Sequence, residues 1–477
     1  MLGSAAPRPS GVPPQDGWVD HYLLAGPADE PCLRMGRIVT RAGLLDLVGE
    51  QQKRLSLAGV ESGGTVTLRL PPSLTYIAVL LAAWRIGAQV SLLDHRLTQA
   101  EVDRALDRLA PEVVVTAART GGAALRGYSE VDALADRRPG GRPAASGHCL
   151  VQLSSGSTGP SKVIARTPQD LIAELARYDR LPDYPARGER MVLLASVVHV
   201  LGLVGGLLQC LHAGVRLDFP ERLTGTGILD AVAADERPTT VLGVPFHAEL
   251  LAAQGDPAQG RFPQLRRMIV AGELTRPGLQ AAFADRYGVP LGTMFGMTEL
   301  GMIATDLTGR HHPAVEPADG MELKLRNGEL LIAAAASPYL GHTDPTRWAD
   351  GWLHTRDAAT VDPQSGLLTL LGRLDSQISI GGLKVDLTEV ERTVTALPGV
   401  AEAVVVFDSV GTGGIDAYLA LQGTTAESVQ ASLVRELAPY KRPRRLHVLP
   451  ALPRTTTGKT LRDPAALRRA AAEHPSS

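Results

Sequence analysis

A run of serine, threonine and glycine between Leu153 and Lys162 is the strongest candidate for a binding site in this sequence. It reads Leu153-Ser-Ser-Gly-Ser-Thr-Gly-Pro-Ser-Lys162 and follows an apolar stretch that is predicted to be a strand. Glycines let the backbone approach an anion, hydroxyl groups donate hydrogen bonds, and the lysine adds a positive charge. The spacing is not that of a Walker A loop. The run predicts a phosphate-binding loop, with a flexible Ser/Gly linker as the alternative.

Two further motifs carry carboxylates suited to a nucleotide and a metal ion. Phe295-Gly-Met-Thr-Glu299 follows a predicted strand. A hydroxyl beside a carboxylate at a strand end can hold a phosphate and Mg²⁺, although a Thr-Glu pair can also cap a helix. Asp357 ends Gly351-Trp-Leu-His-Thr-Arg-Asp357, and a lone carboxylate there can accept hydrogen bonds from both ribose hydroxyls.

Helices and strands must alternate to position these motifs. Helical periodicity spans 40–57, 76–86 and 99–109, and apolar strand patterns lie between these ranges. Further strands are predicted at 149–153, 192–195, 215–219, 240–244, 267–271 and 291–295. Short alternating segments from about Gly320 indicate antiparallel strands, and a smaller unit begins after Leu371. The pattern predicts an α/β fold with a parallel sheet and a small α+β domain at the C-terminal end.

The composition is that of a soluble globular protein in a reducing compartment. The 477 residues carry a net charge of −2, which gives no sign of a nucleic-acid or anionic-membrane partner. The three cysteines lack metal or disulfide spacing, and we expect a cytoplasmic location without a secretory signal. The apolar run 191–211 favours a buried strand, turn and helix over a membrane span, because His199 and three glycines interrupt it. Only six of 48 basic residues are lysine, which makes each lysine worth inspection.

Taken together, the motifs resemble those of the adenylate-forming (ANL) superfamily, which includes acyl-CoA synthetases, aryl-acid adenylating enzymes and nonribosomal adenylation domains. The likeness spans about residues 37–462 and keeps the family's motif order. Besides the phosphate loop it rests on the segments Leu80–Asp94, Phe295–Glu299, Gly351–Asp357, Gly372-Arg-Leu-Asp375 and Pro453-Arg-Thr-Thr-Thr-Gly-Lys459. Five ordered motifs are highly specific where any single one is weak.

The resemblance implies a domain organisation and roles for individual residues. It implies a large domain over residues 1–372 with a β-barrel-like subdomain, a mobile small domain over 376–477, and a hinge at Asp375. It implies that Lys459 is the catalytic lysine, because a compact ammonium can bridge two anions that repel. The implied ATP and AMP contacts are Ser154, Ser155, Gly156, Ser157, Thr158, Gly159, Lys162, Gly272, Glu273, Phe295, Gly296, Thr298, Asp357 and Arg373.

Further roles follow from the same resemblance. Thr298 is expected to contact the α-phosphate, and Glu299 is expected to bind magnesium. Gly381 and Gly382 are expected to line a pantetheine tunnel, with a tight β-hairpin turn as the alternative. The sequence departs from the family pattern at Arg356, where relatives usually have glycine, and at Ser379, where many have lysine.

The implied acid pocket is apolar. Its candidates are His199, Val200, Leu203, Val244, Gly272 and Met297, and the resemblance also gives His199 a catalytic role. Amino-acid-activating relatives carry an aspartate in this segment, and none is present, so an α-amino acid is not expected. The run Lys162-Val-Ile-Ala-Arg-Thr-Pro-Gln-Asp170 resembles aryl-acid adenylating enzymes, although Thr167 and Asp170 could simply cap a helix.

We therefore expect an ATP-dependent acid–thiol ligase that uses Mg²⁺. A compact, preferably aryl, carboxylic acid would become an acyl-adenylate and then pass to coenzyme A or to the phosphopantetheine of an acyl or peptidyl carrier protein. Neither a nucleic acid nor a membrane is expected as partner. Three alternatives stay open: amide formation with an amine, a non-catalytic nucleotide-binding relative, and a membrane-anchored interaction protein built on 191–211.

Overall fold

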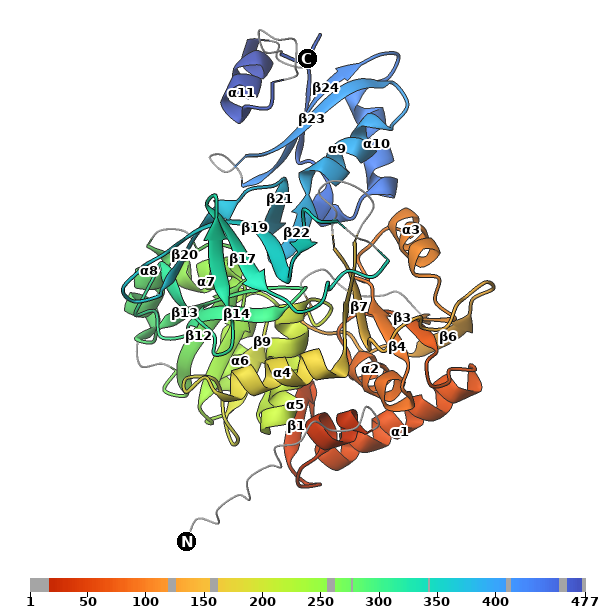
Figure 1. The fold of residues 1–477 in the computed structure, drawn as a ribbon, viewed down its shortest axis with the longest axis vertical. Helices are drawn as coiled ribbons and strands as arrows, with labels where there is room; N and C mark the ends of the chain where they lie inside the picture. Colours follow the sequence, from red (N-terminus) through yellow and green to blue (C-terminus); the bar gives the residue numbers. More distant parts are fainter. Residues whose placement is uncertain are drawn as a thin grey trace.

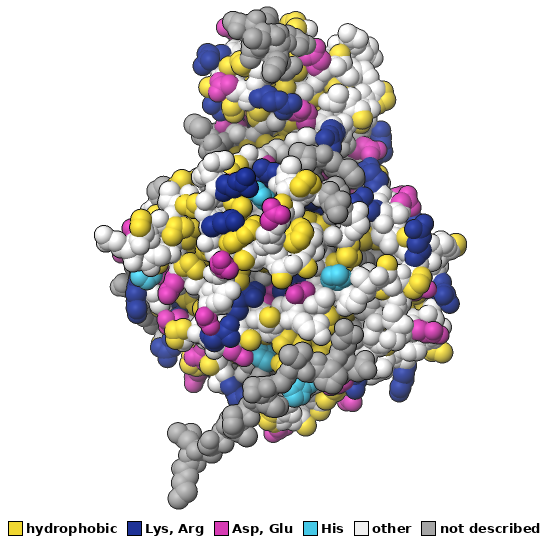
Figure 2. Space-filling model, in the orientation of Figure 1, with side chains coloured by type: hydrophobic (Ala, Val, Ile, Leu, Met, Phe, Trp, Pro, Cys, Tyr) yellow, Lys and Arg dark blue, Asp and Glu magenta, His cyan; other side chains and the backbone are white. Residues whose placement is uncertain are grey.

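The computed structural model describes residues 17–118, 126–154, 162–254, 262–275, 278–341, 344–408, 413–453 and 461–473. A large domain holds two sheets with helices packed on them, and a small domain, blue in Figure 1, sits at one end of it. The predicted α/β fold with a smaller C-terminal α+β part is thereby confirmed. Charged side chains of both signs are interspersed over the face seen in Figure 2.

Local sequence signals fix the helices of the N-terminal part. Thr40 caps α1 (Arg41–Leu57), its hydroxyl accepting the Gly43 amide at 3.2 Å. Helix α2 (Leu74–Ile86) begins two residues before its predicted start, because the Ser73 hydroxyl caps it. It ends at Gly87, whose φ of 88° is the left-handed conformation that glycine adopts easily. Helix α3 (Gln99–Leu109) starts with a complete capping box.

The first sheet has six strands, in the order β6-β5-β3-β4-β7-β8. Its central strands are parallel, as the alternating pattern predicts, and its two edge strands are antiparallel. The strands are β3 (Thr65–Arg69), β4 (Gln89–Leu92), β5 (Val113–Ala117), β6 (Ala133–Arg137), β7 (Leu150–Ser154) and β8 (Lys162–Arg166). The candidate phosphate loop therefore connects β7 to β8, which pair as an antiparallel hairpin.

The second sheet changes character along its length. It has 14 strands, and β9, β11, β12 and β13 pair in parallel, whereas β13 turns back antiparallel into β14. Its strands are β1 (Pro31–Met35), β2 (Arg37–Thr40), β9 (Arg190–Leu193), β10 (Arg216–Asp218), β11 (Thr239–Gly243), β12 (Leu265–Ala271), β13 (Leu291–Met297), β14 (Gly301–Asp306), β15 (Ala314–Pro317), β16 (Leu323–Arg326), β17 (Glu329–Ala333), β18 (Trp348–Ala349), β19 (Trp352–Val361) and β20 (Leu368–Arg373). The antiparallel run from β14 has its own hydrophobic core.

Helices pack on the second sheet, and two of them begin within the apolar run 191–211. They are η1 (Val19–Leu24), α4 (Pro168–Asp179), η2 (Leu201–Leu208), α5 (Gln209–Ala213), α6 (Gly225–Ala233), α7 (Pro245–Ala252) and α8 (Leu279–Tyr287). The expected strand, turn and helix within 191–211 are confirmed, although η2 is a π-helix. A Cβ on Gly202 would lie 2.3 Å from the Ser196 carbonyl oxygen, so this close approach requires glycine. Among the described residues, no helix is both long and apolar enough to span a bilayer.

The small domain packs two helices on one face of a three-stranded sheet and a third helix on the other face. The domain begins with a hairpin. The elements of the domain are β21 (Gln377–Ile380), β22 (Leu383–Asp386), α9 (Leu387–Thr395), β23 (Val400–Asp408), β24 (Gly414–Leu421), α10 (Ala426–Glu436), η3 (Pro439–Lys441), β25 (Arg445–Val448) and α11 (Pro464–Glu473). Buried Val390, Val405 and Leu433 come from α9, β23 and α10 and share one core. The domain therefore has a hydrophobic core distinct from those of the large domain.

A buried lysine joins the two domains. Lys441 of the small domain lies 2.9 Å from Glu101 of α3 and 3.0 Å from Glu389 of α9. Burial alone would lower the pKa of Lys441, but the carboxylates of Glu389 and Glu101 raise it above its usual value. Nearby, the Arg104 guanidinium lies 3.3 Å from the Glu436 carboxylate of α10. The docked arrangement thus depends on charges contributed by both domains.

Lys441→Met is expected to loosen the docking of the small domain. The substitution leaves two carboxylates near a buried seam without their cation, and removing one partner of a buried pair costs roughly 3 kcal/mol. We expect small-angle X-ray scattering to give a larger radius of gyration than for the unmodified chain. Lys53→Met, which changes an exposed lysine of α1, is the control. Identical scattering from both variants would contradict a docking role for Lys441.

Candidate functional site

The first part of the site lies where β13 turns into β14. Glu299 occupies this turn, so the Thr-Glu pair does not cap a helix. The Tyr339 hydroxyl donates a hydrogen bond to Glu299 Oε1 at 3.0 Å. Lys162, at the start of β8, places its ammonium 5.6 Å over the Tyr339 ring and 4.0 Å from the Asp344 carboxylate. Two motifs far apart in the sequence therefore meet through Tyr339.

Lys162 is held in an enclosed position. Its residue exposure is 8%, and burial is the main cause that lowers the pKa of its ammonium. The positive charge of Arg347 adds to this effect, whereas Asp344 and Glu299 oppose it. A partly desolvated ammonium binds a phosphate oxygen more strongly than one in water, because less hydration is lost on binding.

The second part of the site is a carboxylate–guanidinium pair on β19 and β20. The two strands place Asp357 directly opposite Arg373, and Arg373 Nη1 lies 3.2 Å from Asp357 Oδ1. Arg373 also binds both oxygens of Asp375, at 3.0 and 2.7 Å. Burial raises the pKa of Asp357, and the nearby cations Arg373 and Lys384 offset this rise only in part. Arg373 therefore links the candidate ribose ligand to the candidate hinge.

Arg356, which departs from the family pattern, has an unusual backbone conformation. Its φ is 62°, in the left-handed region that favours glycine. Its amide donates to Glu329 Oε1 at 3.1 Å, and its guanidinium donates to the Thr346 carbonyl at 2.7 Å. These contacts anchor this point of β19 despite the left-handed φ of Arg356, so Asp357 still enters the strand pairing with Arg373.

The third part of the site is the hairpin β21–β22 of the small domain, which docks on the large domain. The Ser379 hydroxyl donates to the Gly272 carbonyl at 3.0 Å, and the Gly382 amide donates to Glu273 Oε1 at 2.6 Å. Gly381 and Gly382 form the turn with φ of 57° and 79°, so the β-hairpin alternative describes their backbone. A Cβ on Gly382 would lie 2.4 Å from Val244 Cγ1. The turn therefore approaches Val244 as closely as glycine allows.

The acid-pocket candidates come from several elements. Val244 precedes α7, Gly272 follows β12, and His199 and Val200 precede η2. Gly272, Val244 and Gly382 come close together, since a Cβ on Gly272 would meet the other two at about 4 Å. Two further candidates pack in hydrophobic cores: Leu203 is fully buried in the core of the large domain and Met297 is buried in that of the antiparallel part.

The remaining predicted residues divide into two groups. Phe295 and Gly296 lie on β13 at a bulge against β14, and Thr298 begins the turn that holds Glu299. The backbone of Ser154 ends β7. Outside the described residues lie Ser155, Gly156, Ser157, Thr158, Gly159 and Lys459.

Thr167 and Asp170 serve a helix. The Thr167 hydroxyl accepts the Asp170 amide at 3.1 Å, and the Asp170 carboxylate accepts the Thr167 amide at 2.7 Å. This capping box starts α4. The helix-cap alternative therefore describes the observed contacts of these two residues.

Sequence reasoning missed three residues at the site. Tyr339 holds Glu299, Arg347 lies 3.4 Å from Asp375, and Asp94 lies 3.9 Å from the His199 ring. The spacing of these residues in the sequence does not indicate a role, because each contacts a partner that is distant in the sequence. Asp94 ends the quoted segment Leu80–Asp94, whereas Tyr339 and Arg347 lie in none of the motifs.

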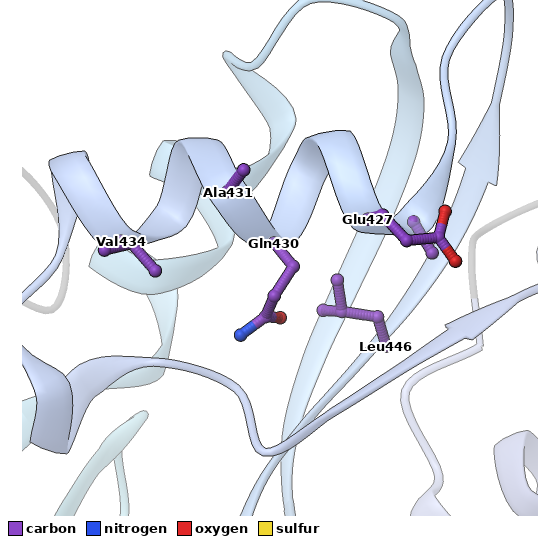
Figure 3. A pocket seen from close by; sticks show the side chains of 6 residues that line it. Glu427, Gln430, Ala431, Val434 and Leu446 are labelled. Carbon is purple, nitrogen blue, oxygen red and sulfur yellow. The ribbon is translucent and has the colours of Figure 1, made fainter.

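A surface groove of about 470 Å³ lies apart from these residues, on the small domain. Figure 3 shows that its wall is formed by one face of α10 and a side chain of β25. Its lining residues are Ala426, Glu427, Gln430, Ala431, Val434 and Leu446. None of them belongs to a motif, so the groove is not the candidate acid pocket.

The fold and the site define a protein with a large α/β domain and a small C-terminal domain. A hairpin of the small domain docks on Gly272 and Glu273 of the large domain, which also carries the charged candidates Lys162, Glu299 and Asp357. The chain belongs to the AMP-binding enzyme family: the model of that family matches residues 24–332, and the model of the AMP-binding enzyme C-terminal domain matches residues 389–459. The resemblance to the adenylate-forming superfamily is thereby confirmed.

Similar proteins carry more specific names. The chain is 26% identical to p-hydroxybenzoic acid–AMP ligase FadD22 of Mycobacterium marinum, over 92% of this chain, and spans 66% of the length of that relative. It is 28% identical to feruloyl-CoA synthase of Amycolatopsis sp., over 90% of this chain and 93% of that protein. Its fold matches o-succinylbenzoate CoA synthetase of Bacillus subtilis with a TM-score of 0.78 at 21% identity, covering 94% of this chain and 97% of that one.

Proposed function

We propose that this protein activates a compact, preferably aryl, carboxylic acid with ATP and transfers the acyl group to a thiol. The observation that carries the proposal is that two charged pairs form between distant motifs: Lys162 lies near Glu299, and Asp357 pairs with Arg373. Lys384 lies close enough to Glu299, Asp357 and Arg373 to interact with all three charges. Cations and hydrogen-bond acceptors are thus available for phosphate and ribose. The names of the aryl-acid relatives support the choice of acid, and feruloyl-CoA synthase supports coenzyme A as acceptor.

Two steps make up the proposed reaction. A carboxylate oxygen of the acid attacks the α-phosphorus of ATP, pyrophosphate leaves, and an acyl-adenylate forms. A thiol sulfur then attacks the acyl carbon, the thiol proton is released, and AMP leaves. Coenzyme A is the first candidate for the thiol, and a carrier-protein phosphopantetheine is the second. We expect both steps to take place in the cytoplasm.

Each group of this chain has a defined task in that proposal. Lys162 binds a phosphate oxygen, and Thr298 donates its hydroxyl to the α-phosphate. Asp357 accepts hydrogen bonds from the ribose hydroxyls, and Arg373 holds it in place at 3.2 Å. The hairpin turn at Gly382 presents its backbone where the pantetheine arm would arrive. We propose Asp375, which Arg373 anchors, as the hinge between residues 1–372 and 376–477.

Magnesium fits the residues that are present. Mg²⁺ is usually held by one or two carboxylates together with substrate phosphates. Glu299 supplies one carboxylate, which Tyr339 orients, and within the described ranges no group of three or more His, Cys, Asp or Glu side chains could hold a metal alone. When bound, the ion neutralises charge on the phosphates and eases departure of pyrophosphate.

Tyr339→Phe is expected to raise the Mg²⁺ concentration needed for half-maximal pyrophosphate exchange by about tenfold or more. The change removes the hydroxyl that fixes Glu299, and a hydrogen bond to a charged group contributes about 1.5–3 kcal/mol, where 1.4 kcal/mol corresponds to a factor of ten. Tyr287→Phe is the matched control, since it removes a buried hydroxyl that binds the Leu251 carbonyl at 2.9 Å elsewhere. Equal Mg²⁺ dependence in both variants would contradict the role of Tyr339.

A panel of acids tests the proposed function. Pyrophosphate exchange is measured with 4-hydroxybenzoate, ferulate, short-chain fatty acids and α-amino acids. Exchange with the aryl acids is expected, and their thioesters should appear when coenzyme A is added. Activity with α-amino acids alone would overturn the pocket argument, and no exchange with any acid would overturn the proposed function.

A further inference from the structure

A buried aspartate lies behind the histidine that borders the candidate acid pocket. Asp94 follows β4 in the first sheet and is 5% exposed. His199 lies between β9 of the second sheet and η2. Its Nε2 lies 3.9 Å from Asp94 Oδ2. The two residues are brought together only by the packing of the two sheets.

Asp94 is rigidly held in its charged form. The guanidinium of Arg96 binds both of its oxygens, at 2.9 and 2.6 Å, and the Arg96 amide donates to Oδ1 at 2.9 Å. Burial would raise the pKa of Asp94, but the nearby His199 ring and the hydrogen bonds and charge of Arg96 hold it well below its usual range. A fixed, ionised carboxylate can therefore direct whatever polar group faces it.

The backbone of His199 is held by hydrogen bonds, whereas its ring nitrogen Nε2 has no hydrogen-bond partner among the described residues. Its amide donates to the Ser196 carbonyl at 3.2 Å, its carbonyl accepts the Leu203 amide at 2.9 Å, and Gln152 donates to the neighbouring Val198 carbonyl at 2.7 Å. The side chain is 42% exposed, yet Nε2 is buried. Within the part of the chain that the structure describes, Nε2 makes no hydrogen bond.

We infer that Asp94 is a positioning residue for His199, holding the ring with Nε2 protonated toward the carboxylate and Nδ1 toward the acid pocket. A separation of 3.9 Å is long for a hydrogen bond, and a small rotation of the ring shortens it, as often happens when a substrate binds. The ionised carboxylate favours the tautomer that carries its proton on Nε2. The inference rests on the proposed function only for the pocket role of His199.

A double-mutant cycle separates positioning from a general structural effect. Asp94→Asn keeps the shape of the side chain and removes its charge. It is expected to lower kcat/KM for 4-hydroxybenzoate in pyrophosphate exchange by about tenfold. In a His199→Ala background the same change should have almost no effect, because the ring that Asp94 orients is absent. Equal losses in both backgrounds would overturn the inference.

Ring NMR tests the same inference without any activity. Long-range ¹H–¹⁵N spectra of histidine-labelled protein, assigned with His199→Ala, are expected to show His199 protonated at Nε2. Asp94→Asn should convert it to a mixture of tautomers. Asp107→Asn, which alters an exposed carboxylate 2.6 Å from Arg138, is the control and should leave the signal unchanged. An unchanged tautomer in Asp94→Asn would overturn the inference, whether or not the protein activates an acid.

Discussion

Lys459→Ala is expected to abolish acyl-adenylate formation while the fold survives. In the proposed reaction a carboxylate must approach the α-phosphate of ATP, and two anions repel. A compact ammonium that contacts both stabilises the charge developing in the transition state, and loss of one such group costs about 100- to 1,000-fold in rate. Pyrophosphate exchange with the best acid of the panel measures the loss.

The flanks of Lys459 explain why folding should be unaffected. The Leu461 amide donates to the Pro453 carbonyl at 2.8 Å, and the Arg462 guanidinium lies 2.5 Å from the Glu391 carboxylate of α9. These contacts do not involve the lysine side chain. Thermal unfolding of Lys459→Ala should therefore match that of the unmodified chain.

Two further variants make the test of Lys459 specific. Lys459→Arg keeps the charge but replaces a point charge by a planar guanidinium, and should recover only a small part of the activity. Lys53→Ala removes an exposed lysine of α1 and should have no effect. Exchange within a few-fold of the unmodified rate in Lys459→Ala would remove this lysine from the mechanism.

Gly382→Leu is expected to slow thioester formation strongly and to spare pyrophosphate exchange. Its φ of 79° costs a non-glycine residue roughly 1–2 kcal/mol. A Cβ there would lie 2.4 Å from Val244 Cγ1, and overpacking of this kind costs typically 1–3 kcal/mol. Because 1.4 kcal/mol corresponds to a factor of ten, we expect a loss of at least about tenfold in the second step.

Gly423→Leu is the matched control for that prediction. Gly423 also has a left-handed φ, of 71°, but a Cβ there would meet nothing within 4 Å. It carries the same backbone strain on the same domain without the contact to Val244. Both half-reactions are measured, exchange for the first and acyl-CoA production for the second. Equal losses in the two half-reactions of Gly382→Leu would contradict a role confined to thiol transfer.

Much of the fold could be predicted because its signals are local. Thr40, Ser73 and Thr98 cap helices through hydroxyls that reach amides three residues on, and Gly87 ends α2 with a left-handed φ. Such interactions need only neighbouring residues. The capping box of Thr167 and Asp170 is equally local, and it agrees with the helix-cap alternative that the sequence offered for this pair.

The site could be predicted only motif by motif. The order of the motifs indicated the family, and the family models at residues 24–332 and 389–459 agree with it. How the motifs meet could not be predicted, since Lys162 and Glu299 come together through Tyr339, which stands in none of them. Contacts between distant segments depend on the packing of whole sheets.

The sequence by itself determined the elements, the family and the chemical character of each motif. It drew attention to the six lysines but placed Lys441 outside every motif. Tertiary structure alone decided that Lys441 bridges two domains, that Gly382 docks against Val244, and that Asp94 faces His199. The physical reason is range: hydrogen bonds and caps act between neighbours in the chain, whereas burial and charge pairing act between neighbours in space.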